Sequence, residues 1–345
     1  MTQHRESMEL GSDVAGASYA SEPVRAQRLP AAIRLLRPHQ WAKGVFVLIG
    51  PFYAGVITHA HAATATALAL VAFCLASSFC YIVNDLADVE ADRAHPRKRH
   101  RPIASGAVSA GLAKALAAGC LIGAAVAVGG VQAISGLARS GEVGGAAPTP
   151  LFGLSLGPAT WLAMAVLAYV ANTTLYSLVL KHRPIVDVLS LSMGFVLRVL
   201  GGCAAVAVVP STFLLNCTLF LAMYLAFGKR LGERRTMGSA ETAAKVRAVQ
   251  SQYTDELLRM LVVVTAVALL VAYTEYVQAM AEKYTFGFNL LWLSVLPAVY
   301  AMLRSIMLLE RGVYDDPTEL AVRDRPFQLA GVLFGLITVT VMLLR

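Results

Sequence analysis

Residues 63–92 read ATATALALVAFCLASSFCYIVNDLADVEAD, an apolar run that passes without a break into a segment with four carboxylates. The apolar part, Ala63–Val83, matches the roughly 20 residues that a helix needs to cross the hydrocarbon core of a bilayer. It is continuously apolar rather than alternating, which favours a helix over a strand of a membrane barrel. The stretch therefore predicts a membrane-spanning helix whose end carries acidic side chains into water.

The same alternation of apolar runs and charge clusters continues along the chain. Hydrophobic residues make up 57% of the sequence and charged residues only 14%, whereas soluble domains carry about 25% charged residues. We therefore predict an all-α, polytopic membrane protein with nine transmembrane helices. The expected spans are Trp41–Thr58, Ala63–Val83, Val108–Ile134, Pro158–Leu180, Ile185–Val208, Thr212–Phe227, Leu257–Met280, Phe288–Leu309 and Phe327–Leu344.

The charged residues indicate how the chain is oriented. Residues 1–28 are polar and have no signal-peptide core, so we expect a disordered cytoplasmic tail followed by one transmembrane domain over residues 29–345. Of the 29 Lys and Arg residues, the connections expected outside, together with the C-terminus, hold only Arg139, Lys283 and Arg345. The positive-inside rule then predicts a cytoplasmic N-terminus and an external C-terminus in the inner (plasma) membrane. This rule also explains the net charge of +8 without a nucleic-acid partner.

Cysteine and histidine spacing points away from metal–thiolate and zinc chemistry. The five cysteines all fall inside expected spans and form no CxxC pair, so we interpret them as small packing residues. The seven histidines show no HExxH or similar spacing.

The acidic segment Asn84–Asp92 is the strongest chemical signal. If the helix continues past Val83, then Asp85, Asp88 and Asp92 follow one another at spacings of three and four and share a face with Asn84. Carboxylates that lie this close repel one another unless a cation neutralises them, and hard oxygen ligands suit Mg²⁺. The alternative interpretation is a solvated helix end that nearby bases balance.

Basic residues follow directly, in the segment HPRKRHRP at 95–102. Taken alone, Lys98, Arg99 and Arg101 fit a positive-inside loop or a patch that binds lipid headgroups. Beside an acidic metal site they fit better as a clamp for phosphate groups.

Three further clusters carry polar residues at the ends of expected spans. Arg198 lies about three helical turns into its span, where an arginine is expected to pair with an anionic ligand or with an acid on a neighbouring helix. The other candidates are Arg37 and Lys43 before the first span, Tyr176, Lys181 and Asp187 between the fourth and fifth, and Lys229, Arg230 and Glu233 after the sixth.

These motifs are similar to those of the UbiA superfamily of intramembrane prenyltransferases. The resemblance rests on NDxxDxxxD at 84–92 and HPxKRxRPIAxG at 95–106. Within the superfamily, a narrower set resembles the branch that transfers phosphoribosyl groups to decaprenyl phosphate. That set comprises RPxQWxK at 37–43, YSxxLK at 176–181, Asp187, GFxLR at 194–198, GKRxxE at 228–233 and DPxxxxxxDR at 316–325.

The resemblance implies a UbiA-type helical bundle with a cytoplasmic active site. It also implies a Mg²⁺-dependent transfer of 5-phosphoribose from phosphoribosyl diphosphate (PRPP) to decaprenyl or another polyprenyl phosphate, which releases diphosphate and supplies a precursor of cell-wall arabinan. The remaining partner is membrane lipid, and assembly into a homo-oligomer stays open. The residues implied in catalysis are Asn84, Asp85, Asp88 and Asp92, and the three aspartates are also the implied metal ligands. The residues implied in PRPP binding are Lys98, Arg99, Arg101, Tyr176, Lys181 and Asp187. Those implied in binding the lipid phosphate are Arg37, Lys43, Arg198, Lys229, Arg230 and Glu233.

One departure separates this sequence from the aromatic-acceptor members of the superfamily. Those members carry a second aspartate-rich motif at the end of the sixth span, where this chain has Lys229 and Arg230. The substitution favours one metal-bound diphosphate and one free phosphate. The alternatives are transfer of a polyprenyl chain from its diphosphate to an aromatic acceptor, and a transporter or lipid-binding scaffold without catalysis.

Overall fold

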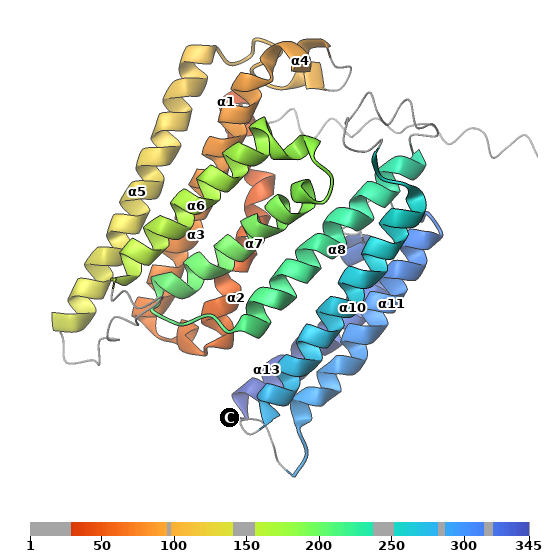
Figure 1. Cartoon of the computed structure of the whole chain (residues 1–345). Helices are drawn as coiled ribbons and strands as arrows, with labels where there is room; N and C mark the ends of the chain where they lie inside the picture. The colour runs from red at the N-terminus through yellow and green to blue at the C-terminus, as the bar shows by residue number, and fades with distance from the viewer. Residues whose placement is uncertain are drawn as a thin grey trace, which may run out of the picture.

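The computed structural model describes residues 29–94, 98–140, 156–236, 252–281, 287–313 and 320–344. These residues form helices and no extended strand (Figure 1). The expected tail 1–28, parts of five connections, and Arg345 lie outside the described residues.

Eight helices within the described ranges are long and apolar enough to cross a membrane, which confirms a polytopic α-helical protein. They are α3 (Ala60–Ala87), α5 (Ala110–Ser140), α6 (Pro158–Leu178), α7 (Val186–Ala205), α8 (Thr212–Thr236), α10 (Asp255–Ala279), α11 (Val295–Glu310) and α13 (Arg325–Leu343). The span that contains α11 also includes the 3₁₀ segment Leu290–Ser294 directly before it.

The expected first span, Trp41–Thr58, is not one long helix, so the count of nine is approximate. It consists of a 3₁₀ segment, Pro38–Gly44, the short helix α2, Val45–Tyr53, and a final 3₁₀ turn, Val56–Thr58. Pro51 lies inside α2 and lacks the N–H that a regular helix requires. At about 2 Å per 3₁₀ residue and 1.5 Å per α residue, residues 38–53 still extend roughly 27 Å.

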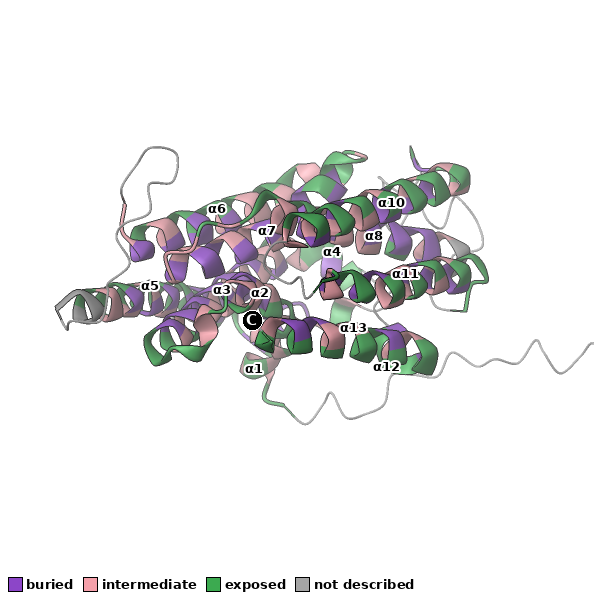
Figure 2. Ribbon diagram, turned by 90° about the horizontal axis from the view of Figure 1, so that it is seen from below, coloured by how far each residue is buried: buried purple, intermediate pink, exposed green. Residues whose placement is uncertain are grey.

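The helices pack as neighbours in a bundle, and Figure 2, seen from below the view of Figure 1, shows that buried residues lie on the sides where the helices meet. One group pairs α3 with α5 and α6 with α7, and α2 packs on α7; a second group pairs α8 with α10 and α11 with α13. Contacts between α7 and α8 join the two groups. Each group has its own buried core, around Phe73 and Leu162 in the first and around Phe227 and Leu258 in the second.

Two glycines allow α2 and α7 to approach closely. A Cβ atom on Gly202 would lie 1.9 Å from the carbonyl oxygen of Val47, and one on Gly50 would lie 2.2 Å from the sulfur of Cys203. Small residues of this kind let membrane helices pack backbone against backbone. The contact fixes α2, and with it the preceding segment that contains Arg37 and Lys43.

Helices α3, α6 and α8 end, and α7 and α10 begin, at the same end of the bundle (Figure 1). We call this the motif end, because the described residues of the acidic segment and of the basic clusters fall there, except Arg198, which lies deeper on α7. The short helices α1 (Ala31–Leu36) and α4 (Val89–Ala94) also lie there, with 3₁₀ turns at Lys98–His100 and Leu180–His182.

Candidate active site

Helix α3 continues past the apolar run into the acidic segment, as expected. It ends at Ala87, and α4 follows after Asp88, so Asp85, Asp88 and Asp92 stay in nearly helical register. The side chains of Asp85 and Asp92 are each only 2% exposed, whereas Asp88 is 32% exposed. The acidic segment therefore carries two buried aspartates, Asp85 and Asp92, and one partly exposed aspartate, Asp88.

Two arginines neutralise the buried carboxylates. Arg37 donates from Nη2 to both oxygens of Asp85, at 2.7 and 2.8 Å. Arg101 donates from one nitrogen, Nη1, to Oδ1 of Asp85 at 3.0 Å and to Oδ2 of Asp92 at 2.7 Å. A guanidinium group thus lies between two carboxylates that would otherwise repel each other.

Asp88 has weaker partners. Its Oδ2 accepts a hydrogen bond from Nδ2 of Asn84 at 3.2 Å and lies 3.8 Å from Nζ of Lys181. Lys181 is itself 31% exposed, so water screens this ion pair. Asp88 is therefore the carboxylate of the acidic segment that can exchange partners most easily.

A polar cavity of about 260 Å³ opens beside these residues, between α3, α6, α7 and the segment before α2. It brings together residues that the sequence assigned to different ligands, because Asn84, Arg101 and Tyr176 share its wall with Arg37, Lys43 and Arg198. The remaining lining residues are Ser77, Cys80, Tyr81, Tyr169, Asn172, Thr173, Ser177, Ser190, Leu191, Gly194 and Phe195. We call this space the polar cavity.

Arg198 reaches the polar cavity from the middle of α7 and is 5% exposed. Its Nη1 donates to the carbonyl oxygen of Gly194 at 2.9 Å and its Nη2 to the hydroxyl of Tyr169 at 2.8 Å. The guanidinium carbon also lies 4.4 Å from the centre of the Tyr169 ring. The acid that one interpretation of the sequence placed on a neighbouring helix is not seen in the described part of the chain.

Asp187 and Arg230 form a separate, buried cluster rather than part of this wall. They are 0% and 3% exposed and make a direct ion pair between α7 and α8. Tyr253, just before α10, donates its hydroxyl to Oδ1 of Asp187 at 3.1 Å and accepts from the N–H of Ile185 at 2.5 Å. Burial raises the pKa of Tyr253 to about 12, so the phenol remains protonated and able to donate.

The other candidates lie nearer the surface of the motif end. Lys229 is exposed and Glu233 is half-buried, on the last turns of α8. Lys98 is half-buried and Arg99 exposed in their 3₁₀ turn, as is usual for residues that meet a ligand from solution. The structure thus brings Arg101 and Lys181 directly to the acidic segment and leaves Lys229 and Glu233 on another helix end.

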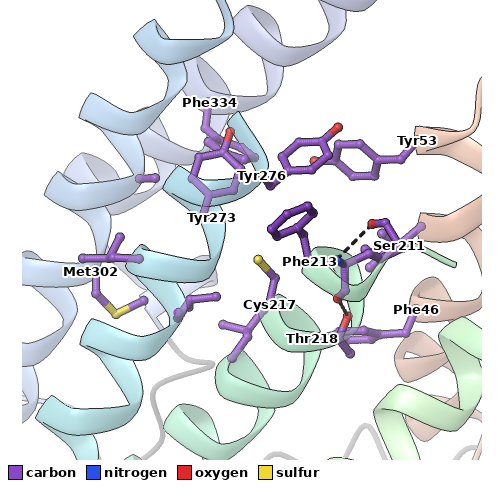
Figure 3. Close-up of a pocket in the computed structure, with 16 residues that line it drawn as sticks. Phe46, Tyr53, Ser211, Phe213, Cys217, Thr218, Tyr273, Tyr276, Met302 and Phe334 are labelled. Carbon is purple, nitrogen blue, oxygen red and sulfur yellow. Dashed lines mark hydrogen bonds between the residues drawn. The ribbon is translucent and has the colours of Figure 1, made fainter. Parts of the chain in front are cut away.

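An apolar cavity of about 410 Å³ lies between α2, α8, α10, α11 and α13 (Figure 3). Aromatic side chains make up much of its lining, and Phe213, Tyr273 and Tyr276 lie on the side of the cavity opposite Tyr53. Phe46 lines the apolar cavity, and its ring packs edge-on against Phe195 of the polar cavity with centroids 4.8 Å apart. This aromatic pair therefore forms a shared wall between the polar and apolar cavities.

The residues of the acidic segment fit a magnesium ion that is shared with a phosphate ligand. Mg²⁺ usually takes one or two carboxylates and completes its octahedron with water and phosphate oxygens. Asp88 and Asn84 offer oxygens next to the polar cavity, whereas the arginines already hold Asp85 and Asp92. Among the described residues, no three His, Cys, Asp or Glu side chains converge on one point, so the protein side chains alone do not form a complete metal site there.

Several residues in and near the polar cavity were not expected from the sequence, although helical spacing could have found some of them. Asn172 precedes Tyr176 by one turn on α6, and it exchanges hydrogen bonds with Ser190 of α7 at 2.8 and 3.0 Å. Tyr81 precedes Asp85 by one turn on α3, and its ring lies 4.6 Å from the Arg37 guanidinium carbon. Tyr253 had no local signal, because it is 66 residues away from Asp187.

Comparison with known proteins gives consistent matches over most of the chain. Residues 44–329 match the family model described as the UbiA prenyltransferase family. The decaprenyl-phosphate phosphoribosyltransferase of Corynebacterium glutamicum is 32% identical over 299 residues, which cover 86% of this chain and 82% of the relative. The enzyme of the same name from Mycolicibacterium smegmatis is 31% identical over 307 residues, 86% and 87% of the two chains.

Solved structures share the fold. A UbiA homolog from Archaeoglobus fulgidus bound to GPP and Mg²⁺ superposes with a TM-score of 0.62 at 16% sequence identity. The superposition covers 90% of this chain and 99% of that one.

Proposed function

This chain belongs to the UbiA prenyltransferase family, and from that membership we propose that it transfers the 5-phosphoribosyl group of PRPP to decaprenyl phosphate. The proposed products are decaprenylphosphoryl-5-phosphoribose, a precursor for cell-wall arabinan, and diphosphate. The observation that carries the proposal is the similarity to two decaprenyl-phosphate phosphoribosyltransferases, which extends over more than four fifths of this chain and of each relative.

The proposed orientation places the motif end at the cytoplasm. The bases Lys98, Arg99, Arg101, Lys181 and Lys229 all lie at this end, in agreement with the positive-inside rule. A water-soluble sugar diphosphate would then reach the polar cavity from the cytoplasm, whereas the lipid acceptor would approach from the bilayer.

The donor diphosphate is proposed to bind between the acidic segment and its neighbouring bases. Asp88 and Asn84, with Asp85 and Asp92 beside them on the same segment, would hold the metal, and Arg101 would be available to a phosphate oxygen. Bound Mg²⁺ supplies neutralisation of the charge that develops on the diphosphate as it leaves. Lys98, Arg99, Arg101 and Lys181 supply charge-assisted hydrogen bonds to the same group.

The reaction exchanges one C–O bond for another at the anomeric carbon. The bond from C1 of the ribose to the diphosphate oxygen breaks, and an oxygen of the acceptor phosphate forms the new bond. Positive charge accumulates on the ribose ring, as in other glycosyl transfers. The acceptor phosphate is already ionised at neutral pH, so the side chains act by positioning and electrostatics rather than as a general base.

The acceptor is proposed to place its chain in the apolar cavity and its phosphate near the shared wall. Lys43 lines the polar cavity and precedes Phe46 by three residues in the chain, whereas Lys229 is exposed on the last turns of α8. Arg230 is buried against Asp187, so its proposed role is to hold the ends of α7 and α8 together rather than to contact the phosphate.

A turnover assay tests the proposed function. Purified protein in lipid is given Mg²⁺, PRPP labelled in the ribose and decaprenyl phosphate, and label is followed into the organic phase. We expect a labelled lipid that disappears when EDTA is added. Transfer instead from a polyprenyl diphosphate to an aromatic acid would keep the family and overturn the proposed reaction.

A further inference from the structure

We propose that Tyr253 is a positioning residue, which sets the place of Lys181 by holding a strained backbone turn at Ile185. This inference rests on the proposed function, in which Lys181 binds the donor diphosphate. It deepens that function, because it names a residue from a distant part of the chain that prepares the diphosphate site without touching the ligand.

The connection between α6 and α7, at the motif end (Figure 1), contains a strained residue. Ile185 has φ 66° and ψ −52°, a conformation that β-branched residues rarely adopt. The N–H of Val186 donates to the carbonyl oxygen of Pro184 at 2.7 Å, so Ile185 is the centre of a γ-turn of the rare, strained hand. The Ile185 side chain is 47% exposed, and the turn therefore needs backbone contacts to hold it.

The side chain of Tyr253 supplies such a contact. Its hydroxyl accepts the N–H of Ile185 at 2.5 Å and donates to Oδ1 of Asp187 at 3.1 Å. Arg230 of α8 pairs with the other oxygen of Asp187, and the Tyr253 ring packs edge-on against Phe227 of the same helix. Tyr253 is 1% exposed. The turn before α7 is thus tied to the second helix group.

Backbone hydrogen bonds connect this turn to Lys181, which lies four residues earlier in its 3₁₀ turn. The N–H of Arg183 donates to the carbonyl oxygen of Leu180 at 3.0 Å, which closes the 3₁₀ turn. The carbonyl oxygen of Arg183 accepts from the N–H of Asp187, also at 3.0 Å. Because both bonds meet at Arg183, a change at Ile185 would shift the backbone that carries Lys181.

The backbone matters here because the side-chain contact of Lys181 is weak. Its Nζ lies 3.8 Å from Oδ2 of Asp88, and the two side chains are each about one third exposed. An ion pair this exposed does little to fix a long, flexible lysine. The place of the 3₁₀ turn therefore decides whether the ammonium group meets a diphosphate beside Asp88 in a productive geometry.

The test measures the affinity of the full-length protein for inorganic diphosphate with Mg²⁺ by titration calorimetry. Tyr253→Phe keeps the ring and removes only the hydroxyl. We expect it to weaken diphosphate about 10-fold, as for the misplacement of one charged donor, and Lys181→Gln to have a similar effect. In the double variant the two losses should not multiply, because both act on the same ammonium group. Losses that multiply to about 100-fold would overturn the inference.

The matched control is Tyr224→Phe. The hydroxyl of Tyr224 is also buried, in the same core around Phe227, and lies 2.5 Å from Oγ of Ser305. This variant should lower the melting temperature about as much as Tyr253→Phe and keep the diphosphate affinity within about 2-fold of wild type. A similar loss of affinity in both variants would reduce the role of Tyr253 to general stability and overturn the inference.

A rescue variant tests the strained turn itself. Glycine adopts a positive φ without the strain that a Cβ atom causes, so Ile185→Gly makes the turn less dependent on Tyr253. Added to Tyr253→Phe, it should restore the diphosphate affinity to within about 3-fold of wild type. A further loss of affinity in this double variant would contradict the proposal.

Failure of the proposed function has a different signature. Wild-type protein would then transfer no phosphoribose to decaprenyl phosphate, while Tyr253→Phe and Lys181→Gln would still be coupled in diphosphate binding. Transfer by wild type, together with independent losses in the two variants, would instead overturn this inference and leave the proposed function in place.

Discussion

One nitrogen of Arg101 donates hydrogen bonds to two buried carboxylates, those of Asp85 and Asp92, and these bonds change the roles that we expect for the aspartates. From the sequence alone, three carboxylates on one helix face indicate a metal site. In the structure, Asp85 and Asp92 also maintain the fold, because each is buried and paired with arginine. Asp88 is 32% exposed, and its basic partner, Lys181, lies 3.8 Å away. The three residues therefore differ in how far they can be changed without loss of structure.

Asp88→Ala and Asp85→Asn should separate catalysis from stability. Asp88→Ala should lower turnover at least about 100-fold, as expected for loss of a group that stabilises transition-state charge, and leave the melting temperature within a few degrees of wild type. Asp85→Asn should also lower the free energy of unfolding by about 1–3 kcal/mol, because it leaves Arg37 without its charged partner and Arg101 with Asp92 alone. Because the two arginines are 21% and 26% exposed, this cost stays below that of a fully buried pair. Thermal unfolding in detergent measures the difference, and equal stability of the two variants would contradict the assignment.

Helix α2 shows how a pair of close contacts positions the site. The helix is short, yet it holds Arg37 and Lys43 in place because Gly202 lets its backbone touch α7. The apolar run at 41–58 predicted a span but not its broken form. Pro38, Gly44 and Pro51 are the local signals for the break, and only the packing on α7 compensates for it.

Gly202→Ala should therefore damage both the fold and the site. The added Cβ would meet the Val47 carbonyl oxygen at 1.9 Å, so α2 must shift away from α7. We expect a loss of about 2 kcal/mol or more of stability, together with weaker turnover as Arg37 moves from Asp85. The matched control is Gly119→Ala on α5, where a Cβ meets nothing within 4 Å and a helix should gain slightly. Similar melting temperatures for the two variants would argue against this packing.

The junction of α11 and α13 provides a pH-dependent contact outside the active site. Asp324 begins α13 by accepting from the N–H of Phe327, and Arg304 donates to both of its oxygens at 2.6 and 2.8 Å. The Arg304 guanidinium holds the pKa of Asp324 below its usual value of 3.8. A carboxyl group whose pKa is lower in the folded protein than in the unfolded chain stabilises the fold fully at a pH above its unfolded-state pKa. This stabilisation is lost as the pH falls through its folded-state pKa.

Asp324→Asn should thus lower the melting temperature at pH 6, and the difference from wild type should shrink as the pH falls below about 4. The control is Glu310→Gln, whose exposed pair with Arg259 should contribute little at any pH. A difference that stays constant from pH 6 to pH 3 would show that the ion pair is not the cause.

At the scale of the whole molecule, the polar cavity and the apolar cavity are separate, with the Phe46–Phe195 pair between them. The sequence predicted the membrane class, the family and the end at which polar residues gather, since those follow from composition and local motifs. It did not predict which bases share a wall, because Arg37, Arg101 and Arg198 come from three segments and meet only after the helices pack. Nor did it predict Tyr253, which stabilises the start of α7 from a distant part of the chain.

Narrowing the apolar cavity should affect the lipid and spare the sugar donor. Leu221 lines this cavity on α8, and Leu221→Trp should raise the KM for decaprenyl phosphate about 10-fold while the affinity for PRPP stays unchanged, a cost typical of overpacking. Leu167→Trp is the control, since Leu167 is 64% exposed on the outside of α6. If PRPP affinity fell instead, the two spaces would not be independent.

The ring of Tyr169, which lies beneath the Arg198 guanidinium and packs on Phe73, also bears on the order in which the substrates bind. Because these rings close the polar cavity on that side, a donor that enters from the motif end would have to bind before the acceptor headgroup blocks its path. The released diphosphate would then leave before the glycosylated lipid. Steady-state kinetics should show compulsory order, with a dead-end complex when excess decaprenyl phosphate binds the empty enzyme.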